Sequence, residues 1–166
     1  MRGFSRVAVA LALSFVGLAG CGPGADITKL AVTDVFSGFY DFGVVEGANK
    51  LVPSLSFRLK NTGPAPINEV QLTVSFWMAE ADGESDSKEV RGIGSGDLGP
   101  GAASDPILVR ADWGYTIQQP RAELFTHHLF KDVTAKIFAK RGGKIVPIGE
   151  FKLDHTIIPQ SPAPTP

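Results

Sequence analysis

Apolar and polar residues alternate with a period of two along much of the chain, a pattern typical of strands with one buried face. Residues 55–59 show it first, and residues 61–64 follow with the turn sequence Asn-Thr-Gly-Pro. Residues 70–78 repeat the alternation over a longer stretch, and the polar residues 82–87 come soon afterwards. The pattern predicts two half-buried strands, the second of which runs into a hairpin tip.

The second half of the chain continues in the same way. Short apolar segments at residues 90–93 and 106–109 predict two more strands. Residues 133–140 alternate again, and Gly142-Gly143 then predicts a tight turn into a last strand within residues 145–157. In that last strand His155 has the same parity as the inward-facing residues. The spacing of these segments is typical of a β-sandwich.

Only residues 121–130 have a helical pattern, with Pro120 placed to start the helix. We therefore predict an all-β protein, an antiparallel β-sandwich of about seven strands with at most one short helix. The side chains expected in its core are Leu55, Phe57, Leu72, Val74, Phe76, Ile137 and Leu153.

The first 20 residues have the pattern of an export signal. Arg2 and Arg6 precede an apolar run over residues 7–19 that only Ser14 interrupts. As a helix this run spans about 20 Å, which is shorter than the ~30 Å hydrocarbon core of a bilayer. It therefore predicts a signal peptide rather than a membrane-spanning helix.

The run ends in Leu18-Ala19-Gly20-Cys21, which resembles the lipobox of bacterial lipoproteins. The resemblance implies that the chain is cut before Cys21 and that this cysteine is acylated, so that the lipid bilayer becomes its first partner. A secretory signal that leaves Cys21 as a free thiol and an uncleaved anchor are the alternatives. Gly22 replaces the aspartate that retains some lipoproteins at the inner membrane, which favours the outer membrane and an extracytoplasmic location.

Four regions follow from these patterns. Residues 1–20 are the expected signal peptide, 21–26 the lipidated N-terminus with a short tether, and 27–158 the β-sandwich domain. Residues 159–166 have a proline at nearly every second position and predict an extended tail. Residues 22–25 span at most about 15 Å, so the tether keeps the domain near the membrane.

The charge and the cysteine content of the chain limit the functions that are possible. The chain has 16 Lys and Arg against 17 Asp and Glu, which gives no electrostatic basis for a nucleic-acid partner. Without residues 1–20 the balance is 14 against 17, a net charge of −3, so we expect a domain that stands off an anionic bilayer. A single cysteine excludes an internal disulfide.

The segment from residue 55 to residue 109 resembles the immunoglobulin-like domains of bacterial surface lipoproteins, including the FxLYD type. The matching sequences are LSFRLKNTGPAPINEVQLTVSFW, EADGE and LGPGAASDPILV. The Tyr-Asp of that family's name is absent, and Phe76-Trp77-Met78 stands in its place. The resemblance implies an immunoglobulin-like fold and an extracytoplasmic interaction role, and it implies no catalytic residue.

No set of residues suited to catalysis stands out. The serines lie in turns or on polar faces, and no nucleophile, base and acid are placed together, so we expect no enzyme and no cofactor. Metal binding has weak candidates in His127-His128 and in the acidic residues 80–89. A small-ligand or metal-binding lipoprotein that takes Ca²⁺ or Zn²⁺ is therefore the alternative function.

The connection from residue 113 to residue 131 is long for a compact sandwich and carries large aromatic side chains. These are Trp113, Tyr115, Phe125 and Phe130. They either close the open end of the sandwich or form a patch that binds a partner, an envelope protein or a glycan. The favoured function is a membrane-anchored, non-enzymatic interaction or structural module of the cell envelope.

Overall fold

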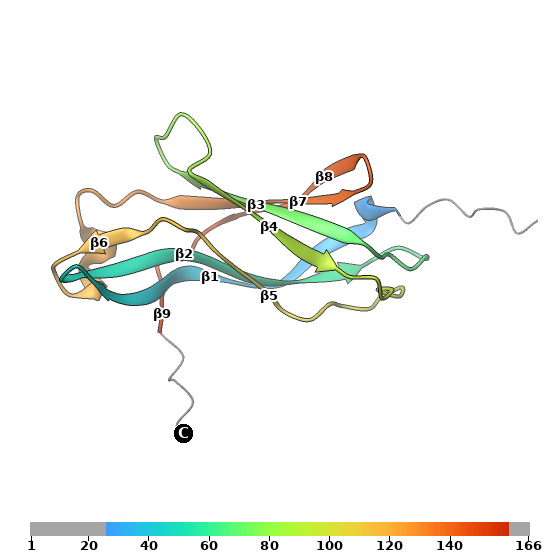
Figure 1. Ribbon diagram of the computed structural model, residues 1–166, viewed down its shortest axis with the longest axis horizontal. Coiled ribbons are helices and arrows are strands. Elements are labelled where there is room, and N and C mark those ends of the chain that lie inside the picture. Colours follow the sequence, from blue (N-terminus) through green and yellow to red (C-terminus); the bar gives the residue numbers. More distant parts are fainter. Residues whose placement is uncertain (1–25, 160–166) are drawn as a thin grey trace, which may run out of the picture.

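The computed structural model describes residues 26–159, which form a sandwich of two β-sheets (Figure 1). The first sheet has the strand order β5-β2-β1-β9, and β6 pairs with β2 as well. The second sheet has the order β4-β3-β7-β8. The predicted all-β sandwich is confirmed, with nine strands in place of about seven. The expected signal peptide, Cys21, the tether up to residue 25 and the tail from residue 160 lie outside the described residues.

The elements follow one another along the chain in a single order. They are η1 (Ile27–Lys29), β1 (Leu30–Val45), β2 (Ala48–Asn61), β3 (Val70–Met78), β4 (Asp86–Ile93), β5 (Ile107–Arg110), β6 (Tyr115–Ile117), η2 (Arg121–Thr126), β7 (Val133–Arg141), β8 (Lys144–Lys152) and β9 (Ile157–Ile158). All strand pairs are antiparallel except β1 with β9. Within residues 26–159, no helix has the length and apolar character needed to cross a bilayer.

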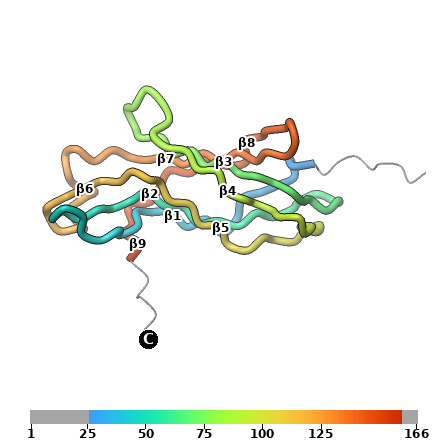
Figure 2. Tube along the Cα trace, in the orientation of Figure 1, coloured from blue at the N-terminus to red at the C-terminus, as the bar shows by residue number. Residues whose placement is uncertain are grey.

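The strands β1 and β2 form one long hairpin that runs the length of the first sheet (Figure 2). Leu30 lies opposite Asn61 at one end, and Val45 lies opposite Ala48 at the other. Between them, Glu46 and Gly47 both have positive φ, 51° and 81°, as a two-residue type I′ hairpin turn requires. The hairpin fixes the long axis of the domain.

The core fills the space between the two sheets. The predicted core residues are all buried, with relative exposures of 0 to 2%; they are Leu55, Phe57, Leu72, Val74, Phe76, Ile137 and Leu153. The alternation seen in the sequence therefore assigns the inner faces of β2, β3 and β7 correctly. The predicted turn at Gly142-Gly143 joins β7 to β8, and the polar segment before Asp86 joins β3 to β4.

Three details of the prediction are wrong. The expected helix over residues 121–130 is only the six-residue 3₁₀ helix η2, and Leu129 beyond it is exposed. The last strand ends at Lys152, and the chain turns before it pairs again in β9. His155 lies in that turn with its side chain about half exposed rather than in the core, because the parity of a strand has no meaning once the strand has ended.

Candidate functional site

The four aromatic residues predicted from the long connection lie together at one end of the sandwich, around Phe39 of β1. We call Phe39, Trp113, Tyr115, Phe125 and Phe130 the aromatic cluster. The ring of Phe39 is completely buried, and the other four are partly buried against the core. The connection is therefore folded onto the sandwich rather than projecting from it.

Ring geometry in the cluster is of the edge-to-face kind. The Phe39 centroid lies 5.4 Å from that of Phe125 at 60° and 5.5 Å from that of Phe130 at 67°. Phe125 and Phe130 are 5.4 Å apart at 85°, and Trp113 meets Tyr115 at 5.4 Å and 76°. Such pairs are worth ~0.5–1.5 kcal/mol each beyond the apolar area that they bury. The rings of the cluster therefore stabilise one another as well as the core.

Strand β6 and a hydrogen bond of Tyr115 hold the connection in place. Tyr115 in β6 pairs with Leu51 of β2, and Gly114 before it packs so tightly that a Cβ there would lie 2.5 Å from the Leu51 carbonyl oxygen. Only glycine allows this close approach of two backbones. The Tyr115 hydroxyl donates a hydrogen bond of 2.7 Å to the Lys131 carbonyl oxygen, and burial raises the pKa of that hydroxyl.

Polar contacts tie the same end to the β1–β2 hairpin. The Arg121 guanidinium in η2 lies 2.8 Å from the Asp41 carboxylate in β1. The Asn49 side chain donates a hydrogen bond of 3.0 Å to the Gln119 carbonyl oxygen. The connection and the hairpin turn therefore belong to one surface, which we call the distal end because it lies far from η1.

His155 completes the cluster from the C-terminal side. Its ring is parallel to that of Phe125, 5.1 Å away, and its Nε2 lies 2.7 Å from Asp132 Oδ1. Asp132 also pairs with Lys152 at 2.6 Å. The hydrogen bonds from Lys152 and His155, in that order, lower the pKa of the Asp132 carboxyl. The sequence pattern placed His155 only on an inward parity and gave no sign of its position beside Phe125.

The predicted metal candidates do not converge. His127 and His128 follow the end of η2 at Thr126, and their rings lie 4.6 Å apart at 34° without a third ligand beside them among the described residues. In the acidic hairpin Glu80 pairs with Lys131, and Asp86 accepts a hydrogen bond from the Asp112 amide. Across residues 26–159 no three His, Cys, Asp or Glu side chains are grouped to hold an ion.

No family model matches the chain, and no curated protein matches it. Among solved structures, the "putative beta-galactosidase" of Bacteroides fragilis aligns with 75% of this chain at 15% identity and a TM-score of 0.44. This chain spans only 17% of that protein. The "Putative ApaA Protein" of Bordetella pertussis aligns with 76% of this chain and 93% of its own length, at 25% identity and a TM-score of 0.31.

Proposed function

We propose that the protein is a membrane-anchored lipoprotein of the cell envelope that serves as a non-enzymatic interaction or structural module. The sequence Leu18-Ala19-Gly20-Cys21 at the end of an apolar run supports acylation at Cys21. The proposed location is extracytoplasmic, at the outer membrane in preference to the inner one. The partner, beyond the bilayer, is an envelope protein or a glycan.

The observation that carries the interaction role is the apolar surface of the distal end. Phe42 and Val44, close to the β1–β2 turn, and Leu129, next to Phe130 in the chain, have relative exposures of 53, 65 and 66%. Large apolar side chains that stay in water at one end of a domain support a binding surface there. Exposed Glu46 and Glu123 provide a polar rim.

The position of this surface suits an anchored protein. Tyr115 lies opposite Leu51, and Leu51 lies opposite Asp41, which is eleven residues along β1 from Leu30. At about 3.3 Å per residue, the cluster lies roughly 35 Å from the end of the sandwich where residue 26 enters. A lipid at Cys21 would therefore leave the distal end free to meet a partner.

The anchor is tested with the Cys21→Ala variant expressed beside the wild type. We expect the wild type to partition into detergent and to have an intact mass that exceeds the mass of residues 21–166 by its acyl groups. The variant should lose both properties. Gly22→Ala, which keeps the cysteine, serves as the control and should behave like the wild type. A water-soluble wild type, or a variant that still partitions into detergent after cleavage, would contradict the anchor.

A further inference from the structure

Charged residues are distributed unevenly along the axis of the sandwich. We call the end that holds η1, the β7–β8 turn and residues 60–71 and 91–103 the proximal end. This end has six Lys or Arg against three Asp or Glu within residues 26–30, 60–71, 91–103 and 140–145. Its cations are Lys29, Lys60, Arg91, Lys140, Arg141 and Lys144.

The distal end has the opposite sign. Residues 41–50, 78–86 and 112–132 contain nine Asp or Glu against three Lys or Arg. The remaining charges, five of each sign, lie outside these ranges, and two of them, Lys88 and Lys152, pair with Asp112 and Asp132 of the distal end. Counted with these two lysines, the distal end has a net charge of about −4 against +3 at the proximal end, although the total charge of residues 21–166 is −3.

Most of the proximal cations are free of acidic partners. Within the described residues the one ion pair at this end joins Lys144 to Asp26 at 3.2 Å. Arg141 donates its hydrogen bonds to the Asn68 carbonyl and side-chain oxygens, which leaves its charge uncompensated. Asp97, one of the three acids, accepts a hydrogen bond from Asn68.

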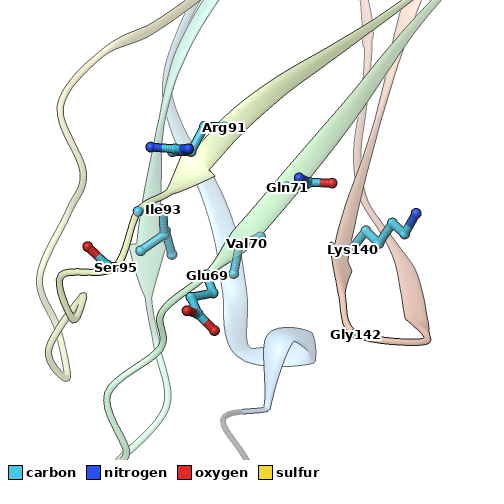
Figure 3. Close-up of a pocket in the computed structure, with 9 residues that line it drawn as sticks. Glu69, Val70, Gln71, Arg91, Ile93, Ser95, Lys140 and Gly142 are labelled. Atoms are coloured by element: carbon cyan, nitrogen blue, oxygen red, sulfur yellow. The ribbon is translucent and has the colours of Figure 1, made fainter.

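Two of these cations border an open groove of about 550 Å³ (Figure 3). Arg91 on β4 and Lys140 on β7 lie on opposite sides of the start of β3, and Glu69 lies between them. Both cations belong to exposed residues. The groove gives this end two cations that can meet an anionic group from outside.

We propose that the proximal end is a docking surface for anionic phospholipid headgroups, which holds the anchored domain upright on the membrane. The proposal rests on the proposed attachment at Cys21, because the five residues from Cys21 to Asp26 span at most about 18 Å. This short span keeps the proximal end near the membrane surface. The potential of an anionic leaflet falls off over about 8 Å at physiological ionic strength, so it attracts the basic end without acting on the acidic one.

Orientation has a direct consequence for the distal end. A domain held by its basic end has its long axis directed out of the membrane plane, so the aromatic cluster faces the space beyond the bilayer. A net charge of −3 alone predicts a domain that is not drawn to the membrane. Because the charges are separated along the axis, we expect the membrane to attract the proximal end but not the distal end.

In the experiment that tests the proposal, the domain is attached to the membrane by chemical coupling. Cys21 is the only cysteine of the chain, so residues 21–166, which contain the whole core, can be coupled through it to a maleimide lipid. Vesicles of pure phosphatidylcholine are compared with vesicles containing phosphatidylglycerol, and lysine acetylation is followed by mass spectrometry. The readout does not depend on whether cells acylate Cys21, so this experiment and the Cys21→Ala experiment fail independently.

We expect Lys29, Lys60 and Lys140 to react about fivefold more slowly on the anionic vesicles than on the neutral ones. Lys50, Lys136 and Lys152 should change less than twofold, and 0.5 M salt should remove the difference. Equal protection of both sets of lysines from acetylation, or no effect of phosphatidylglycerol, would overturn the proposal. Protection of Lys140 by 10 mM inorganic phosphate without vesicles would assign the groove to a free anion and would also overturn it.

Charge reversal provides a matched pair of variants. Arg91→Glu with Lys140→Glu should abolish the protection of Lys29 and Lys60, whereas Lys136→Glu with Lys152→Glu, an equal change of net charge, should preserve it. All four positions are on strands of the second sheet, and circular dichroism checks that both variants fold. Loss of protection in both variants would show that total charge, not its position, controls the contact.

Discussion

Replacing Phe39 by alanine should cost about 3–5 kcal/mol of unfolding free energy, which urea denaturation measures. Phe39 is completely buried and contacts Tyr115, Phe125 and Phe130, so its removal leaves a cavity that three rings border. The loss combines the transfer energy of the phenyl ring with that cavity and with the lost edge-to-face pairs.

The same strand offers a matched control. Phe36 lies three residues earlier in β1 and is 54% exposed. Phe36→Ala removes the same ring from a position where water already surrounds it, and we expect a change within about 1 kcal/mol. Equal decreases in the free energy of unfolding for Phe36→Ala and Phe39→Ala would contradict the placement of Phe39 at the centre of the aromatic cluster.

Replacing Phe76 by alanine should cost a similar ~3–5 kcal/mol. Phe76 lies in β3 opposite Asp86 of β4 and Ala135 of β7, completely buried under the first sheet. The measurement is again urea denaturation. Thr73, on the other face of the same strand, is the control, and Thr73→Ala should cost less than about 1 kcal/mol. Equal losses at the two positions would contradict the assignment of the inner face of the second sheet.

The sequence was sufficient for the parts of the fold in which alternation is unbroken. The strands β3 and β7 and the second half of β2 keep one face inward throughout, so their period of two identifies both the strand and its buried side. The β7–β8 turn was equally clear because glycine occupies it.

The long strand β1 was missed because its alternation is interrupted twice. Its register with β2 shifts between Thr33 and Phe36 and again between Asp41 and Gly43. Each irregularity changes which parity faces inward, so the buried residues Leu30 and Phe39 lie on opposite parities of the same strand. The turn at Glu46-Gly47 between two apolar stretches was the available local signal for this hairpin.

The candidate site was predictable only in part. The concentration of aromatic residues in one long connection identified Trp113, Tyr115, Phe125 and Phe130. Phe39, which contacts the last three of these, belongs to the missed strand, and His155 reaches Phe125 only after the chain has left β8. Contacts between segments so distant in the sequence have no local signature, so the centre of the cluster could not be found from pattern alone.

The packing of the cluster decides how a binding role has to be tested. Tyr115 and Phe125 contact the buried Phe39, so alanine at either position is expected to reduce stability and binding together. The exposed apolar residues around the cluster avoid this difficulty. Leu129 at the distal end and Ile145 at the proximal end have relative exposures of 66 and 60%, which makes them a matched pair.

Site-specific photo-crosslinking in cells at Leu129 and at Ile145 is the most direct test of the distal end as the interaction surface. Each position is replaced in turn by a photoreactive amino acid, and adducts are resolved by mass on denaturing gels. We predict an envelope protein or glycan adduct at Leu129 and no such adduct at Ile145, which the proposed orientation turns toward the bilayer. An adduct at Ile145 with none at Leu129, or equal adducts at both, would contradict the account.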